Sequence, residues 1–287
     1  MNPVWKTCRR EICLATTPKI MGIVNVTPDS FSDGGKYAAQ DAAVAHGLQL
    51  IAEGAEILDI GGESTRPYSD PVALPTELQR VTPVFEELAR QTDIPLSIDT
   101  SKSAVARAAL QAGAEIINDV TGFQGDADMV AVARQFHAGV CAMHMQGTPQ
   151  TMQDHPHYDQ VVDDILHYLL QRRDALLAQG IERSRICLDP GIGFGKTHSH
   201  NLQLLAEVAR FHETGCPILV GHSRKGFIRK FSGDPSRQQR AGTLAVSLHL
   251  ARAGIQILRV HDVLETRQAL RVQQAIEDPR QASEPNY

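Results

Sequence analysis

The sequence predicts a single (β/α)8 barrel, and three observations support this fold class. Eight short runs rich in β-branched or apolar residues recur along the chain. These runs are almost continuously hydrophobic and do not alternate, which is typical of strands buried on both faces of a parallel sheet. A segment with the helical spacing of apolar residues follows each run. Eight such strand and helix units in one chain are the pattern of a (β/α)8 barrel.

The elements follow one another in regular order. The expected strands are Ile20–Val26, Glu56–Gly62, Pro95–Thr100, Glu115–Thr121, Gly139–Met145, Arg185–Pro190, Pro217–Ser223 and Ile255–His261. The expected helices are Asp41–Glu53, Pro75–Arg90, Ser103–Gln111, Asp128–Phe136, Tyr158–Gln179, Asn201–His212, Gln238–Ala253 and Val263–Ile276. Pro75 suits a first helical turn, and glycines such as Gly54 and Gly180 stand just past a helix end.

A doubly wound open sheet is the alternative fold, because it also alternates strands with helices. Such a sheet normally has a glycine-rich fingerprint after its first strand. This chain instead has the polar segment Thr27–Gly35 there, without G-x-G-x-x-G, which favours the barrel. Barrels of this length form one domain. We therefore expect an N-terminal extension over 1–18, the barrel domain over 19–277 and a polar, frayed tail over 278–287.

The composition excludes several classes of protein. The chain has 287 residues, with 33 acidic and 28 basic side chains and a formal net charge of −5. Nucleic-acid binding requires clustered basic residues, and the sequence contains no run of Lys and Arg. The five cysteines show no C-x-x-C spacing, which suggests reduced thiols in a cytoplasmic protein. No uninterrupted apolar run is long enough to span a membrane, so we expect neither a membrane nor a nucleic-acid partner.

Polar residues gather at the carboxyl ends of the expected strands, where a barrel of this kind builds its active site. In strand order they are Asn25; Asp59, Glu63, Thr65 and Arg66; Asp99; Asn118 and Asp119; His144; Asp189; Ser223, Arg224 and Lys225; and Arg259, His261 and Asp262. An aspartate at such a junction is often only a helix cap, and Asp119 and Asp262 fit that interpretation.

The remaining rim residues indicate two kinds of ligand group. Asp99, Asn118 and Asp189 lie in or at the end of apolar strands, where an unpartnered carboxylate is costly. Such groups suit a ligand with an N–H-rich edge, such as an aminopyrimidine ring. The positive charge of Arg66, Lys225, Arg259 and His261 favours an anion, for example a phosphate or diphosphate.

Two other motifs are misleading. The segment Pro190–Thr197 (PGIGFGKT) is similar to a nucleotide-binding P-loop, but a proline stands where the first glycine is needed. The pairs His155/His157 and His198/His200 lie in polar segments without a third ligand nearby. We therefore expect neither a P-loop nor a zinc site.

The rim residues fall within seven phrases that occur in a known order. They are Met21–Gly35 (MGIVNVTPDSFSDGG), Asp59–Pro67 (DIGGESTRP), Ser97–Thr100 (SIDT), Ile117–Gly122 (INDVTG), Asp189–Lys196 (DPGIGFGK), Gly221–Ile228 (GHSRKGFI) and Arg259–Val263 (RVHDV). Together they resemble the dihydropteroate synthase family of pterin-binding TIM barrels. The resemblance implies a folate-pathway transferase that joins 4-aminobenzoate to hydroxymethyl-dihydropterin diphosphate, using Mg²⁺. It also implies that diphosphate leaves before the amine attacks.

The resemblance also implies roles for individual residues. Asp99, Asn118, Asp189 and Lys225 are expected to hold the pterin, while Arg259 lies against it and faces the diphosphate together with Arg66 and His261. Asn25 is the expected Mg²⁺ ligand, and the expected catalytic set is Asn25, Arg66, Lys225, Arg259 and His261. The substrate-binding set also contains Thr65, Phe31, Pro67, Phe194, Met143, Gly226 and Asp33, with Phe31, Thr65 and Pro67 as walls of the aminobenzoate pocket.

Two long loops and one departure from the family pattern complete the expectation. The loops Val26–Lys36 and Glu63–Pro71 fit mobile lids that close over the substrates, with Asp33 pairing with Arg66 on closure. Many members of the family have a serine after Ser-Arg-Lys, where this chain has Gly226. We therefore expect weaker binding of aminobenzoate and of sulfonamides that mimic it.

Two other functions share parts of this pattern. A pterin-dependent methyltransferase barrel has a similar pterin pocket but does not need the Ser-Arg-Lys turn or the loop Thr27–Gly35. A non-catalytic pterin-binding paralogue needs Asp99 and Asn118 but not the diphosphate-facing Arg66. The resemblance favours the synthase, with the two small-molecule substrates as partners and a homodimer as the expected assembly.

Overall fold

The computed structural model describes residues 4–14, 17–26, 35–233 and 239–279. Its main sheet has eight parallel strands: β3 (Lys19–Asn25), β4 (Ile57–Gly61), β5 (Leu96–Asp99), β6 (Ile116–Asp119), β7 (Gly139–Met143), β8 (Ile186–Asp189), β9 (Leu219–Gly221) and β10 (Ile257–Val260). Neighbours follow the order β8-β7-β6-β5-β4-β3-β10-β9. A parallel bridge between Leu188 and Ile218 joins the two ends, so the sheet closes into a barrel.

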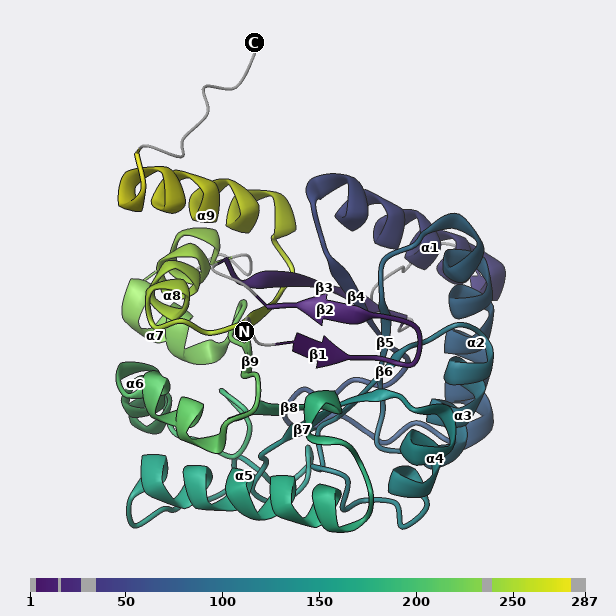
Figure 1. The fold of residues 1–287 in the computed structure, drawn as a ribbon, viewed down its shortest axis with the longest axis horizontal. Helices are drawn as coiled ribbons and strands as arrows, with labels where there is room; N and C mark the ends of the chain where they lie inside the picture. Colours follow the sequence, from purple (N-terminus) through teal and green to yellow (C-terminus); the bar gives the residue numbers. More distant parts are fainter. Residues whose placement is uncertain (1–3, 15–16, 27–34, 234–238, 280–287) are drawn as a thin grey trace.

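Helices surround the barrel in chain order, as the ribbon in Figure 1 shows. They are α1 (Gly35–Glu53), α2 (Leu74–Gln91), α3 (Ser103–Gln111), α4 (Met129–Phe136), α5 (Val161–Ala178), α6 (His198–Ala206), α7 (Gly226–Ser232), α8 (Arg240–Arg252) and α9 (Val263–Glu277). The predicted (β/α)8 fold is confirmed, and the ends of the eight expected strands differ from the observed ones by at most two residues. Among the described helices, none combines the length and the apolar composition needed to cross a membrane.

The expected helix Asn201–His212 is wrong as a single element. The α-helix begins earlier, at His198, because Thr197 and His200 cap it reciprocally: the Thr197 hydroxyl accepts from the His200 amide, and the His200 ring accepts from the Thr197 amide. It ends at Ala206, and the 3₁₀ helix η3 (Val208–Thr214) follows. A further short helix, α7, begins at Gly226.

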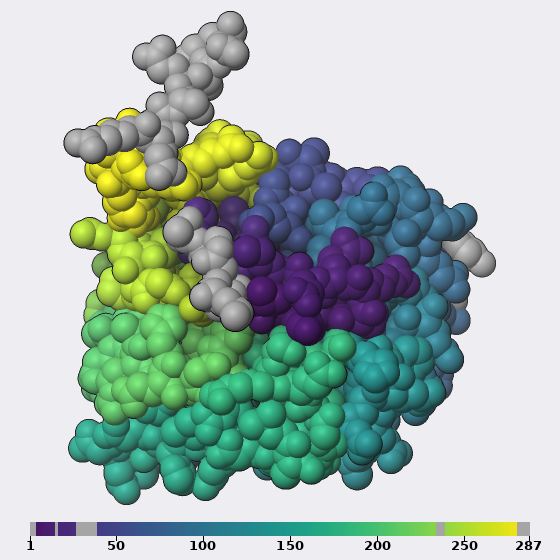
Figure 2. Space-filling view, viewed as in Figure 1, coloured from purple at the N-terminus to yellow at the C-terminus, as the bar shows by residue number. Residues whose placement is uncertain are grey.

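A β-hairpin closes the amino end of the barrel. Strands β1 (Val4–Lys6) and β2 (Glu11–Cys13) pair antiparallel. Trp5 is fully buried against the apolar side chains at this end, and its ring nitrogen donates to the Arg185 carbonyl at 2.9 Å. Figure 1 shows the hairpin lying across the barrel, and Figure 2 shows it filling the middle of this face. The expected extension over 1–18 therefore contains a β-hairpin that covers the amino end of the barrel.

The barrel interior has an apolar layer at its amino end and a polar layer at its carboxyl end. Successive side chains of a strand point to opposite faces, so residues two apart both face inward. The inward pairs are Ile57 and Asp59, Ile116 and Asn118, Cys187 and Asp189, and Ile257 and Arg259. The first member of each pair belongs to the apolar cluster around Trp5. The second member places a polar group at the opposite end, where the expected site lies.

Candidate active site

Arg259 forms the centre of the polar layer. Its guanidinium binds two carboxylates, with Nε 2.6 Å from Asp59 Oδ2 and Nη2 2.7 Å from Asp99 Oδ2. The Asn118 amide donates to the same Asp59 oxygen at 3.0 Å. Strands β4, β5, β6 and β10 therefore contribute one group each to a single hydrogen-bonded cluster. Asp59, which is fully buried, had no assigned role in the sequence analysis. Asp59 stands two residues after the inward-facing Ile57 on the same strand, and this spacing indicates that it also faces inward.

Both carboxylates of this cluster keep an unsatisfied oxygen. Asp59 Oδ1 and Asp99 Oδ1 are buried and have no hydrogen-bond partner among the described residues. Burial raises the pKa of Asp99 to about 7, and the neighbouring Asp59 carboxylate adds to the rise against the opposing effect of Arg259. Because buried acceptors are normally paired, these two oxygens indicate a place for a ligand with N–H donors.

Asp189 and Lys225 lie close enough to Arg259 for their charges to interact. Asp189 Oδ1 accepts from the Gly191 amide at 2.7 Å, and burial raises the pKa of this carboxyl to about 6. Burial lowers the pKa of Lys225 to about 8, and the nearby Arg259 charge contributes. The Lys225 ammonium lies 3.9 Å from the centre of the Phe194 ring, a cation–π contact.

Glycines keep the space between these groups open. A Cβ atom on Gly221 would lie 3.8 Å from Arg259 Cδ and 4.0 Å from Asp189 Oδ2. A Cβ on Gly193 would lie 2.9 Å from Lys225 Cδ, and the backbone there has a φ of +83°. The close contact with the Lys225 side chain and the positive φ both favour glycine at position 193.

An apolar wall stands beside Lys225. Met143 and Phe194 pack with Val120 and Met152 in one buried cluster. The buried Lys196 side chain supports this wall, since its Nζ donates to the Phe194 carbonyl at 2.8 Å and lies 3.0 Å from His144 Nδ1. Its amino group is thus occupied by protein groups, unlike the lysine of a phosphate-binding loop.

His261 and the turn before Lys225 are joined to each other. His261 Nδ1 lies 3.1 Å from Ser223 Oγ, which also accepts from the His261 amide at 3.3 Å. Burial lowers the pKa of His261 to about 3, and the Arg224 and Arg259 charges contribute, so the ring is neutral at pH 7 and does not carry the positive charge expected of it. Arg224 forms two hydrogen bonds with Asp262, at 2.6 and 3.1 Å. The expectation that the Asp262 side chain caps the following helix is therefore wrong, because this ion pair uses the carboxylate.

The other predicted residues are only partly placed. Asn25 is half-buried at the end of β3, opposite Gly61. Thr65 is half-buried, whereas Arg66, Pro67 and Gly226 are exposed, and no hydrogen bond joins their side chains to the Arg259 cluster. Phe31, Asp33 and most of the expected lid over 26–36 lie outside the described residues, as does most of the expected frayed tail.

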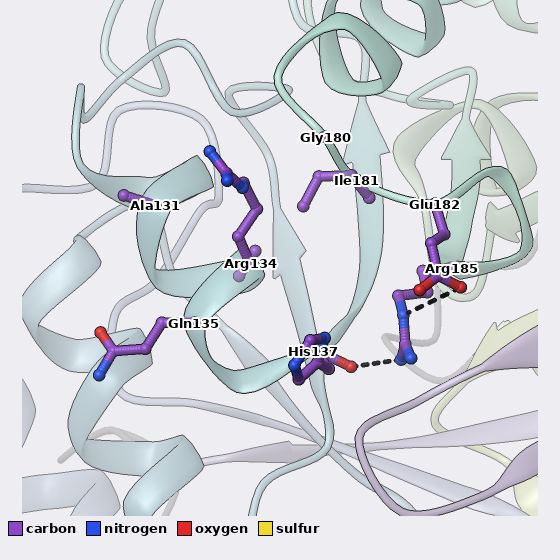
Figure 3. A pocket seen from close by; sticks show the side chains of 9 residues that line it. Ala131, Arg134, Gln135, His137, Gly180, Ile181, Glu182 and Arg185 are labelled. Carbon is purple, nitrogen blue, oxygen red and sulfur yellow. Dashed lines mark hydrogen bonds and ion pairs between the residues drawn. The ribbon is translucent and has the colours of Figure 1, made fainter.

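A separate cavity of about 430 Å³ lies at the opposite end of the barrel, between α4 and the connection from α5 to β8. Figure 3 shows Arg185 turned toward the His137 carbonyl and toward Glu182, while Arg134 extends from α4. The Arg185 guanidinium also donates to the Thr7 carbonyl of the hairpin at 2.7 Å. Arg185 therefore holds the amino end of the barrel together, and the unsatisfied carboxylates lie at the other end.

Comparisons with known proteins point to one family. The family model described as pterin binding enzyme matches residues 21–261. The dihydropteroate synthase of Neisseria meningitidis serogroup B is 46% identical over 279 residues, which cover 95% of this chain and 97% of that protein. The dihydropteroate synthase of Escherichia coli K12 is 45% identical over 258 residues, which cover 90% and 91%.

Solved structures extend the similarity to ligand complexes. A Xanthomonas albilineans dihydropteroate synthase with 4-aminobenzoic acid has a TM-score of 0.91 and 46% identity, covering 97% of this chain and 99% of that one. The same species' enzyme with 7,8-dihydropteroate has a TM-score of 0.87 and 44% identity, covering 96% and 99%. A Yersinia pestis dihydropteroate synthase in a sulfonamide drug complex has a TM-score of 0.89 and 42% identity, covering 96% and 99%.

Proposed function

The chain belongs to the pterin binding enzymes and, within them, to the dihydropteroate synthases, and from this we infer how its own residues carry out the synthase reaction. The enzyme condenses 4-aminobenzoate with hydroxymethyl-dihydropterin diphosphate to give dihydropteroate and diphosphate. The observation that carries our assignment of the pterin site is the pair of buried, unsatisfied oxygens on Asp59 and Asp99. The pterin ring has several N–H groups along one edge, which would satisfy such acceptors.

The pterin is proposed to lie between Arg259 and the apolar wall. Asp59, Asp99 and Asp189 accept from ring N–H groups, and Asn118 can both donate and accept. Lys225 donates to a ring nitrogen or oxygen from its position over Phe194. The guanidinium plane of Arg259 is held by Asp59 and Asp99, so it presents a fixed face to the ring.

The charges of the site suit loss of diphosphate as the first step. The bond between the exocyclic carbon and the bridging oxygen breaks, and its electron pair leaves with the diphosphate. The resulting pterin cation is stabilised by the carboxylates of Asp99 and Asp189, while Arg259 and Arg66 attract the departing anion. The amine lone pair of aminobenzoate then forms the new C–N bond, and the nitrogen loses a proton. Because His261 is neutral at pH 7, it is available as a hydrogen-bond partner for the diphosphate.

The residues present fit a magnesium ion that is shared with the substrate. In the described part of the chain, no group of three or more His, Cys, Asp or Glu side chains can hold a metal. Asn25 offers one hard oxygen, and Mg²⁺ commonly binds through one or two protein oxygens together with substrate phosphates and water. Bound in this way, the ion would neutralise charge on the diphosphate. We propose Asn25 as its protein ligand.

The aminobenzoate is proposed to extend from the pterin toward Phe194 and the loop that carries Thr65 and Pro67. Its amine must face the exocyclic carbon, so its carboxylate points outward, toward the start of α7. Gly226 there provides no side-chain hydroxyl for that carboxylate. Phe31 and Asp33 remain proposed members of this pocket.

A diphosphate-release assay with both substrates and Mg²⁺ tests this function. We expect release that depends on aminobenzoate, with dihydropteroate formed in equal amount. Lys225→Met removes a charge-assisted hydrogen bond, so kcat/KM should fall about 10- to 150-fold. Arg134→Met, in the cavity at the other end of the barrel, is the matched control and should leave kcat/KM unchanged. Absence of product from the wild-type protein would refute the proposal.

We further propose a cytoplasmic homodimer. All five cysteines are free thiols, which suits a reducing compartment. Apolar side chains lie exposed on the last helices, including Phe231 of α7 and Val272 and Ile276 of α9. Apolar surface of this kind suits contact with a second copy. Sedimentation at micromolar concentration measures the assembly directly.

A further inference from the structure

A second polar cluster lies outside the pterin pocket, and we name it the loop anchor: Glu63, Glu77, Thr100 and Lys102. The Lys102 ammonium bridges two carboxylates, those of Glu63 and Glu77, with Glu77 Oε2 at 2.6 Å. The Thr100 hydroxyl donates to the other Glu77 oxygen at 2.7 Å. Glu77 comes from α2 and is fully buried, so the loop anchor joins a helix to two barrel loops.

The charged state of Lys102 is held by its partners. Burial alone would lower the pKa of Lys102, but the hydrogen bonds to Glu63 and Glu77 outweigh it and raise the pKa. A buried carboxylate such as Glu77 requires that partner, because an uncompensated buried charge is strongly unfavourable. Lys102 is therefore the member on which the cluster depends.

One side of the loop anchor closes the loop over 63–72. Glu63 stands at its start, and its second carboxylate oxygen accepts from the Val72 amide at 3.2 Å, which ties the two ends together. Within the loop, the Ser69 hydroxyl donates to the Arg66 carbonyl at 2.8 Å. The Tyr68 amide, also in this loop, donates to the Pro149 carbonyl at 3.0 Å. Glu63 thus joins the two ends of the loop that carries Thr65, Arg66 and Pro67.

The other side of the loop anchor is continuous with the pterin pocket. Thr100 directly follows Asp99, and its amide donates to the Asn118 carbonyl at 3.1 Å. Its hydroxyl also accepts from the Lys102 amide at 3.2 Å. The turn after β5 therefore links the carboxylate of the pterin pocket to the base of the neighbouring loop.

We propose that Lys102 is a positioning residue that sets the affinity for 4-aminobenzoate by holding the loop over 63–72 beside the pterin pocket, without touching either substrate. The proposal rests on the proposed function, in which Thr65 and Pro67 wall the aminobenzoate site. It goes beyond that function by assigning control of one substrate to a cluster outside the pocket.

The test compares two substrates in one variant. In Lys102→Met, KM for aminobenzoate should rise about 5- to 30-fold, which is the effect expected from loss of one positioning contact. The dissociation constant for pterin diphosphate, measured by calorimetry, should stay within about twofold, because Asp99, Asn118 and Arg259 keep their own contacts. Lys102→Arg retains the charge and should recover most of the aminobenzoate affinity.

A matched control separates positioning from general ion-pair loss. Lys19 has the same exposed side-chain fraction as Lys102, 27%, and it binds Glu56 at 2.6 Å at the amino end of the barrel. Lys19→Met should leave both substrate constants unchanged. Combining Lys102→Met with Glu63→Gln should raise KM little further, because both changes break the same contact.

Hydrogen exchange provides a readout that does not depend on turnover. In Lys102→Met the Val72 amide should exchange faster than in the wild type, while amides of β5 stay protected. A lowered melting temperature with unchanged KM and unchanged Val72 exchange would overturn the proposal and leave only a structural role. Parallel weakening of both substrates would also overturn it. Failure of the proposed function would instead appear as an inactive wild-type enzyme in which Val72 exchange still responds to the substitution.

Discussion

At the scale of single residues, three groups of the proposed pterin pocket have pKa values shifted toward neutral pH. Burial raises the pKa of Asp189 to about 6 and that of Asp99 to about 7, and it lowers the pKa of Lys225 to about 8. The proposed pterin contacts require both carboxyls ionised and Lys225 protonated. A protonated Asp99 loses an acceptor, and a neutral Lys225 loses its charge. Affinity for a pterin should therefore fall as pH drops below about 7 and as it rises above about 8.

Calorimetry with a pterin analogue that does not titrate between pH 5.5 and 9.5 measures this profile. We expect the tightest binding between pH 7 and 8, with a loss of up to about tenfold for each pH unit beyond either pKa. Asp99→Asn should bind about 5- to 150-fold more weakly at pH 7.5, because it replaces an acceptor with a group that is partly a donor. It should also flatten the acidic side of the profile. A profile without curvature in the wild type would show that these groups do not contact the pterin.

Gly226 offers a second prediction at the residue scale. It is exposed, and among the described residues a Cβ there would meet only the His198 ring, at 3.7 Å, which leaves room for a serine side chain. Gly226→Ser adds a hydroxyl that can donate to the aminobenzoate carboxylate. Solvent exposure keeps the gain small, so KM for aminobenzoate and the inhibition constants of sulfonamides should both fall several-fold. Steady-state kinetics on both forms decides the matter, and Gly226→Ala, which adds a Cβ but no hydroxyl, should show neither decrease.

A residue of the site could be predicted where its role follows from its place at the end of a strand, and not where its role depends on a partner distant in sequence. Asp99, Asn118, Asp189, Lys225 and Arg259 were expected together because the carboxyl ends of parallel strands share one rim. The loop anchor has no such signal, because its pairing depends on how α2 packs beside the turn after β5. Glu63 appeared among the rim residues, but its contacts lie away from the pocket. Asp262 was misjudged for the same reason, since its partner Arg224 is distant in sequence.

At the scale of elements, the hairpin was the hardest part to predict from the sequence. Strands β1 and β2 have three residues each, which is too short for a clear alternating pattern. The hairpin is held by contacts distant in sequence, including the Thr7 hydroxyl and the Arg10 guanidinium on the buried Glu115 carboxylate. The eight barrel strands were predictable because each is a continuous apolar run. The ends of α6 were not, because a reciprocal cap and a change to 3₁₀ geometry decide them.

The hairpin yields a prediction about stability. Trp5→Ala should lower the free energy of unfolding by about 3–5 kcal/mol, because it leaves a cavity in the apolar layer and removes the bond to the Arg185 carbonyl. Urea denaturation followed by circular dichroism measures the change. Trp5→Phe, which fills most of the space, should cost clearly less. Because the proposed substrate site lies at the opposite end of the barrel, KM values of the folded variants should match those of the wild type. A change in KM would contradict the separation of the two ends.

At the scale of the whole molecule, the apolar layer that stabilises the barrel and the polar layer of the proposed site lie at opposite ends. The alternation of side chains along each strand produces both, since an apolar residue near the amino end is followed two positions later by a polar one. Trp5 and its neighbours seal the apolar end. Arg259 organises the carboxylates at the other end, which leaves acceptors free for a ligand. The fold class followed from the periodic pattern, whereas the hydrogen bonds within the polar layer depend on the register between strands.

The most direct test of this account is a crystal structure of the protein with 7,8-dihydropteroate. We predict that ring N–H groups of the pterin lie within hydrogen-bond distance of Asp59, Asp99 and Asp189, with the ring between Arg259 and Lys225. The aminobenzoyl group should extend past Phe194 toward the loop over 63–72. A pterin bound elsewhere, for example in the cavity beside Arg134 and Arg185, would contradict the account, as would unsatisfied Asp59 and Asp99 oxygens in the complex.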